Sequence, residues 1–157
     1  MTYDSAADTL RHIMAVRDLL GRSAGELLRR SEVHDRTKLE EPEKSTFDRV
    51  TPLLRTLVFD TPEYKASLAE MGPALAHHYA HNSHHPEHHP GGVAGMDLFD
   101  LLEMACDWTA ARQRHDSDRG KPWTPEEVAI RTERFGIGPQ LASILVNTLV
   151  RLPVPRA

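Results

Sequence analysis

Apolar residues recur at helical spacing in every segment that could form a core, and this pattern constrains the fold most. Between about 5 and 30, leucine and isoleucine return every three or four residues, as at Leu10 and Ile13. The same period continues over 45–58 and 96–114. A period near 3.6 indicates amphipathic helices, and no segment alternates at period two long enough to predict a strand. The sequence therefore predicts an all-α fold, with one long or two broken helices at its start.

Two proline-marked signatures predict where helices begin. Thr61 precedes Pro62, and Thr124 precedes Pro125, so each hydroxyl can cap a helix that has proline at its first position. The helix from Thr61 is expected to continue into a histidine-rich tract and to stop near Pro86, because the residue before a proline disfavours the α region. In total we expect about six helices.

Length and composition fit one globular domain that covers residues 1–157. The net charge of −4 gives no broad basic face, so a nucleic-acid polymer is not an expected partner. The chain has no apolar run of about 18 residues and no visible signal peptide, so no membrane contact is expected. The single cysteine, Cys106, fits a reducing cytoplasm. The protein could also form a homo-oligomer.

The segment 76–92 reads AHHYAHNSHHPEHHPGG and holds seven of the ten histidines. If the preceding helix continued through it, His78, Asn82 and His85 would lie on one helix face. Imidazole is a common ligand of borderline metal ions, and one helix face can supply two such ligands. The candidate metal ligands of the tract are His78, His84 and His85. Surface positions are expected for His81, His88 and His89.

Further candidate ligands lie before the tract. His34 and Asp35 form a dipeptide in a polar connector, where adjacent side chains can converge on one cation if the chain bends. On a regular helix they would diverge by about 100°. His12 lies one residue from the apolar stripe of the first predicted helix and could point inward. The alternative for His12 is a hydrogen-bonded histidine at the edge of the core.

A row of acidic residues at helical spacing marks one face of the predicted helix over 96–114. Asp100, Glu103 and Asp107 occupy positions i, i+3 and i+7. Such a row is often a solvated face, but this one borders residues that should be core. We therefore treat Asp107 as a candidate ligand and Asp100 and Glu103 as weaker candidates.

In chain order the candidates read histidine, His-Asp, histidine, histidine, aspartate. This order on a helical scaffold resembles the HD-domain superfamily of metal-dependent phosphohydrolases, and the lysine of HDRTK matches the HD-x-x-K form of several branches. The segment HHYAHNSHHPEHH, followed by MDLFDLLEMACDW, is similar to a small bacterial and phage family of unknown function. That second likeness extends over nearly the whole chain, from the RHI at 11–13 to the helix that contains QLASIL.

The HD resemblance implies an HD-domain-like helical domain that hydrolyses a small phosphorylated substrate, by analogy a nucleotide. It implies one or two divalent cations, with Mn, Fe, Mg, Zn, Ni and Co not distinguished. The ligand set it implies is His12, His34, Asp35, His78, His84, His85 and Asp107. One ion could be held without the histidine tract, or the tract could complete a second site.

The resemblance also implies catalytic roles for charged residues near these ligands. Lys38 would hold a phosphate oxygen or orient the attacking water. Glu87 would act as a general base or support a ligand histidine. Arg112 and Arg114 could bind a second phosphate, although exposed helix charges are the simpler interpretation.

Two other functions remain open at this point. Some HD-fold proteins that resemble this chain use two irons and oxygen to oxidise a C–H bond, and the same ligand types fit them. The chain could also be a non-catalytic metal-binding helical module whose histidine tract is incidental. Metal identity separates the first alternative from hydrolysis, and metal stoichiometry tests the second.

Overall fold

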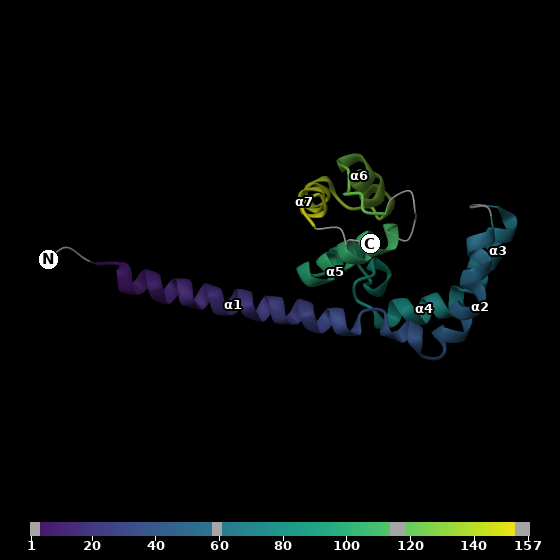
Figure 1. The fold of residues 1–157 in the computed structure, drawn as a ribbon, viewed down its shortest axis with the longest axis horizontal. Helices are drawn as coiled ribbons and strands as arrows, with labels where there is room; N and C mark the ends of the chain where they lie inside the picture. The colour runs from purple at the N-terminus through teal and green to yellow at the C-terminus, as the bar shows by residue number, and fades with distance from the viewer. Residues whose placement is uncertain (1–3, 58–60, 114–118, 153–157) are drawn as a thin grey trace. The chain divides into compact units, whose positions relative to one another are not determined.

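The computed structural model describes residues 4–57, 61–113 and 119–152 (Figure 1). It divides into two compact units, Met1–His34 and Asp35–Ala157. The described residues form seven α-helices and three short 3-10 helices, with no strand among them. The all-α prediction is confirmed, with one helix more than the six expected. A single domain over 1–157 stays a prediction.

The first unit is one helix, α1 (Ala6–Val33), which Figure 1 shows without a break. Gly21 and Gly25 do not interrupt it, because a glycine inside a helix costs only about 1 kcal/mol and the neighbouring residues are good helix formers. Ion pairs one turn apart, such as that of Asp18 with Arg22 at 2.9 Å, add support. Taken by itself, α1 buries none of its residues.

The second unit begins with a group of helices that pack against one another. These are η1 (Arg36–Leu39), α2 (Glu43–Thr56), α3 (Pro62–Glu70) and α4 (Gly72–His81). The helix start at Thr61 is confirmed, since its hydroxyl accepts a hydrogen bond from the Tyr64 amide at 3.2 Å. The expected single helix from there to Pro86 is wrong. A second helix begins at Gly72, because Pro73 cannot donate to the ladder of α3, and it ends at His81.

The chain continues through two short 3-10 helices into three further α-helices. These elements are η2 (Pro86–His88), η3 (Gly92–Gly95), α5 (Leu98–Arg112), α6 (Pro125–Arg134) and α7 (Pro139–Leu149). Capping boxes fix the starts of α5 and α6. In the first, Asp97 and Asp100 exchange side-chain and backbone hydrogen bonds, and Thr124 and Glu127 do the same in the second.

The hydrophobic core of the second unit lies between α5, α6 and α7. Its buried members are Leu101, Met104, Ala105, Trp108, Trp123, Val128, Ile137, Leu145 and Leu149. Trp108 stacks on Phe135 with ring centroids 5.4 Å apart, and the indole N–H of Trp123 donates to the Thr109 hydroxyl at 2.9 Å. This packing fixes α5, which carries Glu103 and Asp107.

Within the three described ranges, no helix combines the length and the apolar character needed to cross a membrane.

Candidate metal centre

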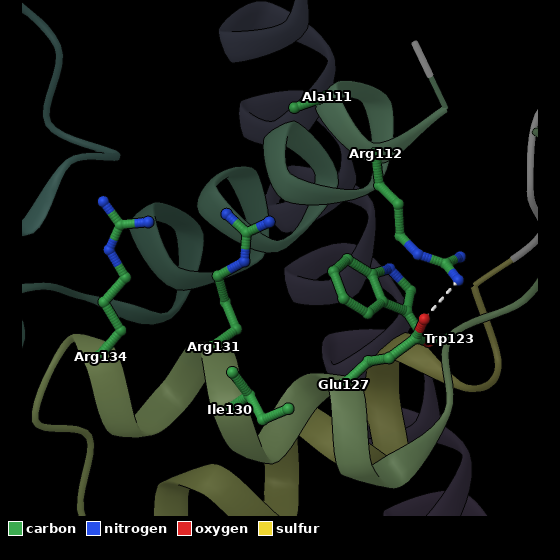
Figure 2. Close-up of a pocket in the computed structure, with 7 residues that line it drawn as sticks. All are labelled: Ala111, Arg112, Trp123, Glu127, Ile130, Arg131 and Arg134. Atoms are coloured by element: carbon green, nitrogen blue, oxygen red, sulfur yellow. Dashed lines mark hydrogen bonds and ion pairs between the residues drawn. The ribbon is translucent and has the colours of Figure 1, made fainter. Parts of the chain in front are cut away.

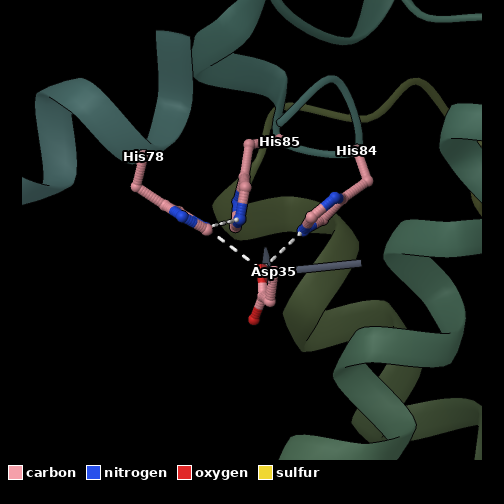
Figure 3. Close-up of side chains that lie close together, drawn as sticks. All are labelled: Asp35, His78, His84 and His85. Carbon is pink, nitrogen blue, oxygen red and sulfur yellow. Dashed lines mark hydrogen bonds and ion pairs between the residues drawn. The ribbon is translucent and has the colours of Figure 1, made fainter. Parts of the chain in front are cut away.

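Asp35 lies at a sharp turn between α1 and η1. Its φ of 55° makes it the one non-glycine residue with a positive φ in the described part of the chain. The left-handed region costs most residues about 1 kcal/mol, but aspartate tolerates it better. Such conformations concentrate at functional sites, where the surrounding structure holds them in place. Here the turn directs the Asp35 carboxylate toward the histidine tract (Figure 3).

Three imidazoles meet at this carboxylate (Figure 3). Asp35 Oδ1 lies 3.3 Å from His78 Nε2 and 3.5 Å from His84 Nε2. His85 Nε2 lies 2.9 Å from His78 Nε2. One ligand atom from each of the four residues lies within 4.8 Å of the others. We call these four residues the metal cluster.

The metal cluster forms because the chain turns directly after α4. Asn82 ends the helix in an extended conformation, and its amide donates to the His78 carbonyl at 2.8 Å and to the Thr37 hydroxyl at 3.0 Å. The turn returns the chain so that His84 and His85 approach His78. The sequence placed His78 and His85 together on one continuous helix. The structure also brings them together, but by this turn.

Carboxylates hold the far side of two cluster histidines, one of them buried and the other partly buried. His78 Nδ1 lies 3.0 Å from Glu43 Oε2, and His84 Nδ1 lies 3.1 Å from Glu103 Oε1. A carboxylate that accepts a hydrogen bond from Nδ1–H leaves the Nε2 lone pair free, and in both residues Nε2 is the atom near Asp35. Carboxylate–histidine pairs of this kind orient the ligands in many metal sites.

Glu43 is fully buried and lies against several hydrogen-bond donors. Its second oxygen lies 2.7 Å from His77 Nδ1. Burial by itself would raise the pKa of Glu43. Hydrogen bonds from His77, Thr37 and His78 lower that pKa below its usual range. Glu43 therefore stays ionised near neutral pH and keeps His78 in the required orientation.

His85 is held in the neutral form that binds a metal. Burial lowers its pKa to about 3, and the neighbouring His84 and His78 add to this effect, whereas Asp107 opposes it. Asp107 also lies close to Asp35, since one carboxylate oxygen of each is within 4.8 Å of the other. Two carboxylates this close repel each other, and a shared cation relieves that repulsion.

The candidate catalytic residues lie in different places. Lys38 Nζ is 2.5 Å from Asp35 Oδ2, so the two oxygens of Asp35 face a lysine on one side and histidines on the other. Glu87 is exposed on η2 and is not brought into the metal cluster. Burial of Tyr79 raises the pKa of its phenol, and the charge of Glu87 adds to this rise.

Two of the predicted ligands, His12 and His34, belong to the first unit. His34 caps the C-terminal end of α1 and directly precedes Asp35, and its role as a ligand stays a prediction. His12 lies 22 positions before His34 in the same continuous helix. At about 1.5 Å per residue this separates the two by about 33 Å. Within α1 the structure therefore does not bring His12 to His34.

Two other sequence interpretations change with the structure. His89 was expected at the surface, but its side chain is only 15% exposed and its Nε2 lies 2.9 Å from the Ser83 carbonyl. Arg112 was considered for phosphate, but it is buried and pairs with Glu127 at 2.8 Å. Arg114 lies outside the described residues.

The donor set could hold a metal ion. Three imidazole nitrogens and the nearby carboxylates of Asp35 and Asp107 are ligand types that bind metal ions in proteins. The partial burial of the metal cluster and the carboxylates behind His78 and His84 also agree with a metal centre.

Comparison with known families gives one result. The model of a family of unknown function, DUF5662, matches residues 1–151. The chain belongs to the DUF5662 family. No match is found among curated proteins or among solved structures.

Replacing Glu43 with glutamine is expected to weaken metal binding about 10- to 100-fold, the usual effect of losing a carboxylate behind a ligand histidine. The amide keeps the shape of the side chain but removes the charge that orients His78. A competition titration with a metal-binding dye measures the change. Glu41→Gln, which alters an exposed carboxylate two positions away, is the matched control. Equal affinities in the two variants would show that Glu43 does not support the site.

The stability of the metal-free protein is expected to fall on acidification between the unfolded and folded pKa values of His85. The unfolded chain protonates His85 near 6.5, whereas burial holds the folded pKa to about 3. In this window the unfolded state binds more protons, so lower pH favours unfolding. Urea unfolding at about pH 7, 6 and 5 measures the slope. The free energy of unfolding should depend less steeply on pH in His85→Asn. The same pH dependence in the wild type and the variant would contradict a lowered pKa of His85.

Proposed function

We propose that this chain is an HD-type metal-dependent phosphohydrolase that acts on a small phosphorylated molecule. The observation that carries the proposal is Asp35, whose Oδ1 faces His78 and His84 while its Oδ2 pairs with Lys38. A metal ligand and a cationic side chain thus lie side by side, as phosphoryl transfer requires. The HD resemblance of the sequence supports the same reaction by analogy.

The roles of the chain's own residues follow from their positions. Asp35, His78, His84, His85 and Asp107 bind the cation. When bound, such an ion supplies Lewis-acid chemistry, since it lowers the pKa of water and draws charge from phosphoryl oxygens.

Lys38 is the residue we assign to a phosphoryl oxygen of the substrate. Its side chain is about one-third exposed and can therefore reach a ligand. The centre of the Phe47 ring lies 5.6 Å from Lys38 Nζ, within range of a cation–π contact. Glu87 receives no role at the metal cluster in this proposal, because it is exposed on η2.

The three imidazoles of the metal cluster also favour a second candidate function, because they suit iron as well as zinc or manganese. That function is oxidation of a small substrate by an HD-fold diiron centre. The two candidates require different metals and co-substrates, so one experiment separates them.

The test is reconstitution of chelated protein with manganese, cobalt, nickel, zinc or iron(II), followed by an assay of phosphate release. Suitable substrates are p-nitrophenyl phosphate and nucleoside monophosphates. We expect metal-dependent phosphate release that is lost in Asp35→Asn. Absence of release with every metal, together with an oxygen-dependent absorbance change of the iron form, would support the oxygenase instead. Absence of both would leave a non-catalytic metal-binding module.

A further inference from the structure

A second feature of the same unit is a cavity of about 420 Å³ between the end of α5, the segment around Trp123 and α6 (Figure 2). This volume falls in the range of small-molecule sites. Three arginines line the cavity, and they differ in how they are held.

Arg112 belongs to the wall of the cavity. One of its nitrogens donates to the Lys121 carbonyl at 2.7 Å, and the other pairs with Glu127 at 2.8 Å. Its guanidinium also lies 5.0 Å from the centre of the Trp123 ring. These contacts satisfy Arg112 internally, so it is not available to a ligand.

Arg131 and Arg134 are held differently. They lie one turn apart on α6 and point to the same side of the helix (Figure 2). Aromatic rings support both, with the Arg131 guanidinium 5.5 Å from the Trp108 ring and that of Arg134 5.9 Å from the Phe135 ring. Across the residues that the structure describes, neither guanidinium has an ion pair or a hydrogen bond.

This arrangement places two positive charges one turn apart at the cavity, with Arg131 partly buried and Arg134 exposed. Burial lowers the pKa of Arg131, and the neighbouring charge of Arg134 lowers it further. Like charges in such a place are unfavourable unless an anion lies between them. Planar guanidinium groups match the oxygens of phosphate, to which they can donate two parallel hydrogen bonds.

The arginine pair is also close to the metal centre. The Arg131 guanidinium lies over the ring of Trp108, the residue that follows Asp107 on α5. The charge of Asp107 raises the pKa of Arg131, and that of Arg134 lowers the pKa of Tyr79. The Tyr79 ring packs against His85 with centroids 5.0 Å apart. A ligand bound by the two arginines would therefore lie beside the candidate ligands of the cation.

We propose that Arg131 and Arg134 form an oxyanion subsite that holds a phosphate group of a small-molecule ligand beside the metal centre. The choice of phosphate among oxyanions rests on the proposed function. The existence of the subsite rests on the cavity and on the charge pair alone.

The test is calorimetric titration of the full chain with inorganic phosphate, before and after removal of metal by chelation. In the chelated protein, Arg134→Gln and Arg131→Lys should each weaken phosphate binding about tenfold or more, because each loses charge-assisted hydrogen bonds. Arg22→Gln, which makes the same charge change on α1, should bind as the wild type does. Asp35→Asn should also keep phosphate binding in the chelated protein.

Several outcomes would overturn the subsite. They are absence of phosphate binding by the wild type, equal binding by the arginine variants, or binding that needs Asp35 and added metal. Arg131 packs on two tryptophans, so its substitution could destabilise the fold, and a melting curve of that variant must be recorded. Arg134 is exposed, so its substitution should leave the fold intact and the test of the subsite decisive. The titration measures phosphate binding and not turnover. The result for the subsite therefore stands even if the chain hydrolyses no phosphate ester.

Discussion

The Asp35→Asn variant is expected to bind divalent metal more than about 100-fold more weakly than the wild type. This loss exceeds the loss of affinity that follows from changing a residue behind a ligand, because Asp35 is itself a proposed ligand. Oδ1 of Asp35 lies between two imidazole Nε2 atoms, and its negative charge is central to the metal cluster. The substitution keeps the size of the side chain and removes that charge. Elemental analysis after equilibration with one equivalent of metal measures the loss, and circular dichroism should show unchanged helix content. We expect the same result for Asp107→Asn.

His12→Ala is the matched control for this experiment. The sequence pattern included His12 among the ligands, whereas the continuous helix α1 separates it from the other candidate of its own unit, His34, by about 33 Å. The variant should therefore retain its metal. Metal loss in His12→Ala, or full occupancy in both aspartate variants, would contradict the site described above.

Removal of metal is expected to lower the melting temperature by about 10 °C, since an ion at 1,000 times its Kd adds about 4 kcal/mol. The ligands come from distant parts of the chain, at Asp35, in the segment from His78 to His85 and at Asp107. The unfolded chain does not assemble them, so the free energy of metal binding stabilises the folded state. Thermal unfolding with chelator and with added metal measures the difference.

Asp35→Asn supplies the control for the thermal experiment as well. Its melting temperature should be the same with chelator and with metal. If the wild type shows no difference either, the ion does not bridge these segments. A shift of equal size in the variant would indicate that the metal binds elsewhere, for example at the exposed histidines of the tract.

Much of the fold could be predicted because local signals determine it. Apolar spacing identified the helices, and the caps at Thr61 and Thr124 form as expected. The division between α3 and α4 was not predicted, although Gly72 and Pro73 carry a signal for it. The turn at Asn82 depends on a hydrogen bond to Thr37, which is 45 positions away in the sequence. Long-range contacts of this kind are not visible in local patterns.

The candidate site could be predicted by residue type but only partly by position. Histidines and aspartates in a recurring order indicated ligands, and the structure brings Asp35 and the three tract histidines together. Glu43 was missed because its importance arises from burial between α2 and α4, and its own segment appears polar. Glu103 carried a detectable signal, since it lies one turn before Asp107. His12 stays a prediction. The continuous helix α1 separates it from His34 by about 33 Å, and the sequence pattern did not show this length.

We propose that this chain holds a transition metal at Asp35 and the three tract histidines. Elemental analysis tests this on protein purified without a histidine tag and without a nickel column, which could load the tract with nickel. We expect at least one divalent transition-metal ion per chain, either as purified or after incubation with manganese, iron, cobalt, nickel or zinc followed by desalting. Protein that retains none of these ions would contradict it.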